Sequence, residues 1–459
     1  MASTHQTSTT VLIVGCGTWG SSTALHLARR GYKNVTVLDP YEVPSAISAG
    51  NDVNKIVEQG TWRLIMSGCI LEANAGRHTI VGHRGEDASV SNRVVLEATA
   101  AWQTDPVFKQ YYHATGVVIA ATQPENVEEL YESERATPDN GYKRLESAED
   151  FRKTMPEGVL TGDFPGWKGW AKKDGCGWVH ARKALMSAAL EAQRLGVKLI
   201  TGSPHGQVTT LIFEENDVKG AVTADGKEHR AEHTILCAGA NAPQLLDMKN
   251  QLRPTAWTLA HIKMTDEEVE LYKNLPVLFN VERGFFMEPD EDNHELKICD
   301  EHPGYCNALP HVDDKSTYVS TPFAKHQIPL TSEQGVREFL RETMPHLAER
   351  PFSFARICWC ADTPDRGYLI TSHPDYPSLT LGVGGSGHGF KVIPTVGGYI
   401  ADCMEGKLDE RMKRTWRWRP ETALGRDWTA VQGRMGGSYK VLDFTDVKAD
   451  GWTAIVSKL

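Results

Sequence analysis

Three glycines near the start of the sequence have the spacing of a dinucleotide-binding turn. Gly15, Gly17 and Gly20 form the pattern G-x-G-x-x-G directly after the apolar run 11–14. In such a turn the first glycine permits a tight bend, the second lets the backbone approach a pyrophosphate, and the third allows a helix to pack closely on a strand. Asp39, at the end of the next apolar run, can accept hydrogen bonds from ribose hydroxyls. Its carboxylate would repel a 2′-phosphate, so the pattern disfavours NADP but does not separate FAD from NAD.

The segments around these glycines form a strand–turn–helix–strand unit. Residues 11–14 are typical of a strand, 21–30 of a helix with one apolar face, and 35–38 of a second strand. Residues 60–93 have no clean period of either kind, and we expect irregular structure there. Further strands are expected at 197–201, 208–213, 220–223, 234–239, 284–287, 296–299 and 379–383, and helices at 94–102, 125–134, 148–154, 181–195 and 333–344.

Composition excludes several classes of protein. The chain has 459 residues, long enough for two domains, and a formal net charge of -10 without any basic block, so no nucleic-acid surface is expected. The nine cysteines are scattered and form no C-x-x-C pair. We therefore expect no metal site, no disulfide framework and a reducing compartment. No stretch of the sequence reaches the length of a membrane span, so no membrane partner is expected.

Four longer motifs resemble those of one enzyme family. Residues 354–365 (FARICWCADTPD) and 384–391 (GGSGHGFK) are similar to motifs of the monomeric sarcosine oxidase family. Residues 49–55 (AGNDVNK) and 296–304 (LKICDEHPG) narrow the resemblance to the fungal fructosyl amino acid oxidases, or amadoriases. The resemblance covers nearly the whole chain. It implies an α/β fold with a Rossmann-like FAD-binding domain of the D-amino acid oxidase type and a second, α+β substrate domain that contains an antiparallel sheet.

The same resemblance implies a division into domains. The FAD-binding domain is expected to be discontinuous and to comprise residues 8–100, 177–242 and 360–410, with 61–93 as an irregular insertion. The substrate domain is expected at 101–176 and 243–359, followed by a C-terminal extension at 411–459. Relatives have a short acidic helix where this chain has residues 61–93, and the difference is either an insertion or an error of the gene model. An inactive FAD-binding protein is therefore one alternative for this chain.

The family resemblance also implies how the cofactor is held. FAD is expected to be attached covalently through its 8α-methyl group to Cys358, whereas Cys360 is expected to face away from the flavin and to be structural. The remaining residues expected to bind FAD, from the glycine motif and from the resemblance, are Gly15, Gly17, Thr18, Trp19, Gly20, Asp39, Ala49, Gly50, Asn54, Lys55, Val208, Ala238, Gly239, Asp362, Gly387, His388, Phe390 and Lys391.

Charged residues of the motifs are assigned to the reaction and to the substrate. Lys297 matches the lysine that in this family lies over the flavin and activates O2, where a fixed positive charge stabilises superoxide in a dry site. Lys297, Cys358 and Lys55 make up the expected catalytic group. Lys391 matches a residue that binds the substrate carboxylate, and Glu301 and Arg434 match residues at the entrance. The full set implied for the substrate is Asp52, Lys55, Glu301, Lys391 and Arg434.

These residues predict an FAD-dependent oxidase of fructosyl amino acids, which are Amadori products. The expected reaction consumes O2 and water and yields glucosone, the free amino acid and hydrogen peroxide. The main alternative is a related oxidase of sarcosine, pipecolate or saccharopine, because its pocket chemistry would be similar. An NAD dehydrogenase is a third possibility that the glycine motif alone leaves open.

The last three residues predict a destination. Ser457, Lys458 and Leu459 form the tripeptide that the peroxisomal import receptor reads at a free carboxylate. We therefore expect the protein in the peroxisome, a compartment that suits a peroxide-forming enzyme. A monomer is expected.

Overall fold

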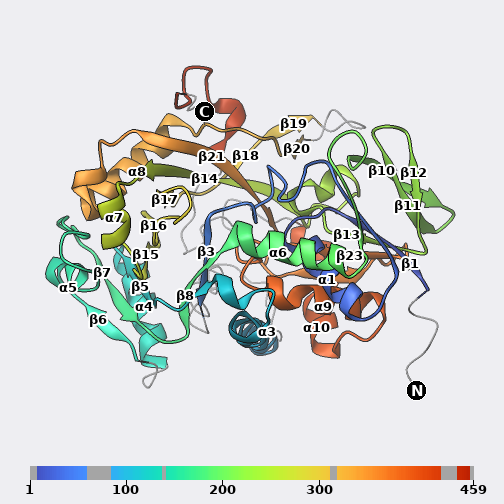
Figure 1. Cartoon of the computed structure of the whole chain (residues 1–459), viewed down its shortest axis with the longest axis horizontal. Coiled ribbons are helices and arrows are strands. Elements are labelled where there is room, and N and C mark those ends of the chain that lie inside the picture. Colours follow the sequence, from blue (N-terminus) through green and yellow to red (C-terminus); the bar gives the residue numbers. More distant parts are fainter. Residues whose placement is uncertain (1–7, 59–83, 137–140, 311–317, 425–441, 455–459) are drawn as a thin grey trace.

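The computed structural model describes residues 8–58, 84–136, 141–310, 318–424 and 442–454, and it is organised around two large sheets (Figure 1). The first sheet has six strands, which are parallel apart from one antiparallel edge pair. Its order is β22 (Leu369–Ser372), β23 (Leu379–Val383), β13 (His233–Leu236), β1 (Thr10–Val14), β2 (Asn34–Asp39) and β9 (Lys198–Thr201).

Both faces of this six-stranded sheet are covered, as its apolar strands require. Val11 and Ile13 of β1 pack into a core shared with four helices, whereas Leu12 and Val14 point to the opposite face. The helices are α1 (Thr18–Arg29), α3 (Arg84–Thr104), α6 (Ala181–Arg194) and α9 (Ile393–Met404). The opposite face is covered by a three-stranded sheet of β10 (Val208–Glu214), β11 (Asp217–Thr223) and β12 (Glu228–Arg230).

Helices α1 and α9 lie unusually close together because a glycine faces a serine. A Cβ atom on Gly397 would lie 2.2 Å from the backbone carbon of Ser22, so only glycine fits there. The hydroxyl of Ser22 donates to the carbonyl of Ile393 and accepts from the N–H of Gly397. This contact seats α9 against the helix that begins at the glycine turn.

The second sheet has ten strands and is mainly antiparallel. Along this sheet the strands are β24 (Leu442–Asp443), β18 (Tyr305–Cys306), β14 (Arg253–Lys263), β17 (Glu295–Asp300), β16 (Gly284–Phe286), β15 (Val277–Asn280), β5 (Val117–Ala121), β7 (Lys168–Lys172) and β6 (Lys143–Leu145), with β21 (Phe352–Asp362) paired to β14. Alternate residues of its central strands point to opposite faces of the sheet. Ala260 and Ile298 pack in a core with α8 (Leu330–Thr343), whereas Leu259, Cys299 and Cys358 form a cluster on the other face.

Smaller elements complete the fold. Two further sheets contain β3 (Asn54–Glu58), β8 (Cys176–His180) and β4 (Tyr112–His113), and β19 (Ala308–Pro310) with β20 (Tyr318–Ser320). The remaining helices are α4 (Pro124–Ala136), α5 (Ala148–Arg152), α7 (Asp266–Leu271) and α10 (Glu410–Thr415), and the 3-10 helices are η2 (Lys109–Tyr111), η3 (Gly239–Gln244), η4 (Pro345–Leu347), η5 (Pro420–Ala423) and η6 (Phe444–Asp446). Among the described residues no helix combines the length and the apolar character that a bilayer crossing requires.

The fold class expected from the sequence is confirmed, with two corrections. Irregular structure over 84–93 is wrong, because α3 begins at Arg84 and buries Val90 and Val94 on the face that continues to Trp102. Residues 59–83, which make up most of the expected insertion, lie outside the described part of the chain. Helix α9 was not expected, because its two adjacent glycines and its proline disguise its apolar face.

Strands from separate parts of the chain build each sheet. The six-stranded sheet takes strands from residues 10–39, 198–236 and 369–383, and the ten-stranded sheet takes them from 117–172, 253–306, 352–362 and 442–443. Strand β24 lies within the expected C-terminal extension and pairs with β18. The proposed domain boundaries stay a prediction.

Candidate functional site

A cavity of about 640 Å³ is lined by residues of both large sheets. One end is formed by the glycine turn after β1 and by the end of β2, and the other by β14, β17 and β21. Its volume lies in the range of small-molecule and cofactor sites. The cavity therefore joins a dinucleotide-type turn to the face of the ten-stranded sheet that carries Cys358.

The glycine turn has the geometry that its sequence predicts. Gly15 has φ +100°, and a Cβ there would lie 2.6 Å from the carbonyl oxygen of Cys237. A Cβ on Gly20 would lie 1.8 Å from the carbonyl oxygen of Gly15, so this glycine permits α1 to pack on β1. Gly17 is the N-cap of α1 and lines the cavity together with Thr18. The first backbone N–H groups of α1 have no partner within the helix and are suited to a phosphate.

Asp39 is fixed at the end of β2, where it lines the cavity. Its Oδ2 accepts a hydrogen bond from the N–H of Cys16 at 2.7 Å, and its Oδ1 accepts one from the N–H of Tyr41 at 3.0 Å. Burial raises the pKa of Asp39 although these two backbone donors oppose the rise. The carboxyl group is thus held in one orientation, with lone pairs left for hydroxyl donors.

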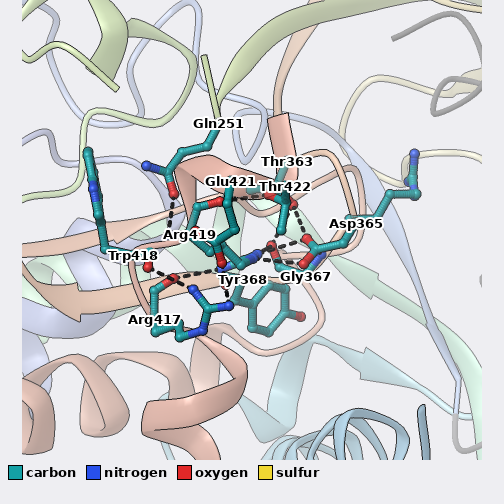
Figure 2. Close-up of polar contacts among 12 residues, drawn as sticks. Gln251, Thr363, Asp365, Gly367, Tyr368, Arg417, Trp418, Arg419, Glu421 and Thr422 are labelled. Carbon is teal, nitrogen blue, oxygen red and sulfur yellow. Dashed lines mark hydrogen bonds and ion pairs between the residues drawn. The ribbon is translucent and has the colours of Figure 1, made fainter. Parts of the chain in front are cut away.

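The glycine-rich loop after β23 lines the cavity. A buried arginine, Arg419, holds the neighbouring turn between β21 and β22 (Figure 2). Arg419 is 4% exposed and makes a bidentate ion pair with Asp365, with its Nε 2.7 Å and its second terminal nitrogen 2.8 Å from the two carboxylate oxygens. Arg419 also donates to the carbonyls of Gly367 and Tyr368. Although burial favours the neutral acid, Arg419 lowers the pKa of Asp365 to about 2.

This ion pair fixes the turn between β21 and β22, and that turn supports the glycine-rich loop. Arg366, next to Asp365, donates to the carbonyl of Ser386 at 2.6 Å, and the N–H of Ser386 donates to Ala361 at 3.0 Å. Ser386 has φ +44°, which a side chain rarely adopts without such support. The loop therefore presents a preformed surface to the cavity.

Three thiols lie at the other end of the cavity. Cys358 is 7% exposed, lines the cavity and packs with Leu259 and Cys299, which also line it. Cys360 lines the cavity too, so the expectation that it faces away is wrong. Residues two apart on a strand point to the same face, and both cysteines are on β21. None of the eight cysteines within the described ranges forms a disulfide, and Cys69 lies outside those ranges.

One carboxylate compensates two ammonium groups beside these thiols. Asp52 Oδ2 lies 2.6 Å from Lys55 Nζ and 2.7 Å from Lys297 Nζ, and Lys297 also donates to the carbonyl of Asn54 at 2.9 Å. Asp52 and Lys297 are each 2% exposed. Lys297 Nζ lies 5.5 Å from the ring centroid of Phe285, which lines the cavity together with Asp52 and Lys55.

The charges in this cluster determine one another's protonation. Burial alone would favour the neutral acid, yet Lys297, Lys55 and Arg356 together hold the pKa of Asp52 well below its ordinary value of 3.8. Burial would favour the neutral amine of Lys55, and Asp52 outweighs it and raises the pKa of Lys55. Three cations thus surround one carboxylate, and this corner of the cavity carries a net positive charge that suits an anion.

Most residues expected to form the site do line the cavity. These are Gly15, Gly17, Thr18, Trp19, Asp39, Ala49, Asp52, Lys55, Val208, Ala238, Gly239, Glu301, Cys358, Gly387, His388, Phe390 and Lys391. Lys297 lies directly behind this lining, bonded to Asp52, and Asn54 and Asp362 are buried outside it. Gly50 is closely packed, because a Cβ there would lie 2.5 Å from Thr18 Oγ1. Arg434 lies outside the described residues.

The sequence reasoning missed the contribution of β14. Trp257 and Leu259 line the cavity from this strand, and they pair in register with Cys358 and with Cys299, respectively. The strand RPTAWTLAHIK is buried almost throughout, so its sequence carries no alternation that would show which residues face the cavity. Arg356 lies on the same face of β21 as Cys358 and went unnoticed for the same reason.

Comparisons with known proteins agree with this geometry. The model of the FAD dependent oxidoreductase family matches residues 10–403. The structure is similar to fructosyl amine:oxygen oxidoreductase (amadoriase I) from Aspergillus fumigatus, with TM-score 0.90, 55% identity and coverage of 97% of this chain and 98% of that one. It is also similar to fructosamine oxidase (amadoriase II) from the same organism, with TM-score 0.87, 55% identity and 98% coverage of both chains. L-saccharopine oxidase of Schizosaccharomyces pombe is 28% identical over 95% of this chain and 99% of its own length.

We expect the substitution Asp52→Asn to destabilise the protein strongly. It leaves Lys55 and Lys297 without their shared carboxylate, and breaking a buried ion pair in this way costs about 3–5 kcal/mol. Because the native pKa of Asp52 is lowered, its ionised form stabilises the fold above about pH 4, and this contribution is lost as the pH falls below that value. Urea unfolding followed by tryptophan fluorescence at pH 7 and at pH 3 measures both effects, and the difference between wild type and variant should shrink at pH 3.

Asp247→Asn is the matched control for this experiment. Asp247 pairs with Lys249 at 2.5 Å, but both side chains are more than half exposed. An exposed pair contributes little, so the control should unfold almost as the wild type does. Equal losses in the two variants, or a loss in Asp52→Asn that is as large at pH 3 as at pH 7, would contradict the role given to Asp52.

Proposed function

The chain belongs to the FAD dependent oxidoreductase family, in its amadoriase branch, and on this premise we propose that it oxidises the secondary amine of fructosyl amino acids. The substrate, O2 and water are converted to glucosone, the free amino acid and hydrogen peroxide. The observation that carries this proposal is the 55% identity, over nearly the full length, to two oxidases whose names specify fructosyl amines.

The residues of the cavity fit FAD. The free N–H groups at the start of α1 would hold the pyrophosphate, and Asp39 would accept hydrogen bonds from the adenosine ribose. The face of β14, β17 and β21 would lie against the isoalloxazine, with Cys358 at its edge. When bound, FAD supplies the acceptor for a hydride, and the protein supplies position and electrostatics.

In the proposed reaction the charged cluster supplies fixed positive charges beside the flavin. Lys55 lines the cavity and keeps its proton, because Asp52 raises its pKa. Lys297 holds a second positive charge directly behind the cavity wall, with its Nζ bound to Asp52 and to the carbonyl of Asn54. Fixed cations in a dry site favour the negative charge that develops when O2 accepts an electron, and we assign that role to Lys297.

The substrate is proposed to lie between this cluster and the entrance. Glu301 and Lys391 line the cavity from β17's C-terminal end and from the loop before α9. A carboxylate and an ammonium group at these positions can bind the two charges of an amino acid. Holding the amine beside the flavin supplies much of the rate, since orientation replaces a bimolecular encounter.

We expect the purified protein to form hydrogen peroxide with fructosyl glycine, fructosyl valine or fructosyl lysine. A coupled peroxidase assay with these three compounds and with sarcosine, L-pipecolate and L-saccharopine measures the preference, and fructosyl compounds should give at least tenfold higher kcat/KM. Saccharopine deserves inclusion because L-saccharopine oxidase is similar to this chain over nearly its whole length. Turnover of saccharopine or sarcosine alone would refute the fructosyl substrate, and a yellow protein without peroxide from any amine would support the inactive alternative.

We further propose that FAD is bound covalently through Cys358. The thioether would replace the thiol hydrogen of Cys358 and one hydrogen of the 8α-methyl group, and O2 would accept the two electrons released. The position of Cys358 in the cavity wall, which Lys55 also lines, supports this attachment.

Intact mass measured under denaturing conditions tests the attachment. The wild type should carry about one FAD mass, and Cys358→Ala should lose it. Cys360→Ala is the matched control, since this thiol lines the same cavity two residues away on the same strand, and it should retain the flavin. The reverse pattern, with flavin lost only from Cys360→Ala, would move the attachment to Cys360.

We also propose that the protein is imported into peroxisomes. The support is the tripeptide Ser457-Lys458-Leu459, which lies outside the described residues. A fluorescent protein fused before Met1 should colocalise with a peroxisomal marker in yeast, and deletion of the tripeptide should disperse it. Retention in peroxisomes after the deletion would assign the import to another signal.

A further inference from the structure

A buried histidine lies beside Lys297 on the face of the ten-stranded sheet that backs the cavity. His261 of β14 pairs directly in register with Lys297 of β17. Directly paired residues of antiparallel strands point to the same face, with their Cβ atoms about 4.5–5.5 Å apart. His261 is 3% exposed, and it lies at none of the positions that the sequence motifs identified.

The ring of His261 is held in one orientation by a carboxylate. Its Nδ1 lies 2.8 Å from Oε2 of Glu295, and the other oxygen of Glu295 accepts from the hydroxyl of Ser353 at 2.9 Å. A carboxylate accepts hydrogen bonds, so the proton of neutral His261 sits on Nδ1 and leaves a lone pair on Nε2. Among the described residues Nε2 has no hydrogen-bond partner, although a buried polar atom without one is costly.

The overall reaction releases one proton and later consumes one. The ammonium form of a secondary amine must lose one proton before its C–H bond can give up a hydride. The hydride carries two electrons and one proton, whereas O2 needs two electrons and two protons to become hydrogen peroxide. The second proton therefore equals the one that the ammonium group lost, and a buried acceptor could hold it between the two events.

We propose that Nε2 of His261 is this acceptor: it takes up the proton released from the substrate ammonium and returns it when O2 is reduced. The inference rests on the proposed function. In it His261 holds the proton but does not touch the substrate. His261 is the direct cross-strand neighbour of Lys297, whose Nζ is bonded to the same oxygen of Asp52 as Nζ of Lys55, a residue that lines the cavity.

The charges that face His261 set when it can accept a proton. Burial lowers its pKa and Lys297 lowers it further, whereas Glu295 and Asp52 oppose that change. Arg356 adds a cation on the same face of β21, and the ring of Phe354 covers His261 with centroids 5.1 Å apart. The imidazole is therefore neutral at pH 7, and a new negative charge in the cavity would raise its pKa and favour proton uptake.

The pH dependence of the flavin midpoint potential measures this coupling without substrate. Each proton taken up with the two electrons changes the reduction equilibrium tenfold per pH unit, which is about 30 mV. At pH values between the pKa of His261 in the oxidised enzyme and its pKa in the reduced enzyme, the wild-type holoenzyme should take up two protons with two electrons. The reduction equilibrium should then change a hundredfold per pH unit, which is about 60 mV in midpoint potential. In His261→Asn the reduction equilibrium should change only tenfold per pH unit, because the asparagine amide can still donate to Glu295 but has no atom in place of Nε2.

His205→Asn is the matched control, since His205 also pairs with a carboxylate, Asp225 at 2.7 Å, but is exposed. It should keep the wild-type slope. A wild-type slope of one proton, or equal slopes in wild type and His261→Asn, would overturn the proposal. If His261→Asn does not fold, ¹⁵N-histidine NMR of the wild type decides: Nε2 of one buried histidine should become protonated on reduction, and an unchanged spectrum refutes the idea.

The potential is measured with a chemical reductant, so its outcome is independent of the substrate. Failure to oxidise fructosyl amino acids would overturn the proposed function and leave the slope unaffected. A one-proton slope in an enzyme that turns over fructosyl amino acids would overturn the role of His261 alone.

Discussion

The shared carboxylate of Asp52 is the interaction on which the chemistry of this cavity depends. Burial alone would favour the neutral amine of Lys55, because desolvation penalises the charged form. Asp52, whose Oδ2 lies within 2.7 Å of Nζ of both Lys55 and Lys297, raises the pKa of Lys55, and the two lysines in turn lower the pKa of Asp52. The arrangement leaves a net positive charge behind the cavity wall, which is what an anionic partner in the cavity would need.

The alternation of side chains between the two faces of each strand determines which residues can take part in this arrangement. Leu259, Cys299 and Cys358 occupy one face of the ten-stranded sheet, and Lys297, His261 and Arg356 share that face. The opposite face is an apolar core against α8. A register shift of one residue in β17 would move Lys297 into that core and Ile298 into the cavity wall, so the pairing of β14 with β17 is as important to the site as the residues themselves.

How much of the site could be predicted depended on the sequence distance between its parts. The glycine turn and Asp39 were predictable because strand, turn, helix and acid follow one another within a short segment. The bond between Asp52 and Lys297 joins residues 245 positions apart, and no periodicity in a single sequence reveals such a contact. The side of Cys360 was predictable from strand period and was nevertheless assigned wrongly. The start of α3 at Arg84 was missed because the apolar spacing of Val90, Val94 and Trp102 is diluted by polar residues between them.

Arg419 has a consequence for the order in which the protein becomes functional. It lies 54 positions after Asp365, the partner that it clamps, and its guanidinium is what holds the turn beneath the glycine-rich loop. During synthesis on the ribosome the turn that contains Asp365 emerges well before Arg419. The ion pair between Arg419 and Asp365 can therefore form only after α9 and α10 have been synthesised, so this support for the cavity wall is added late in translation.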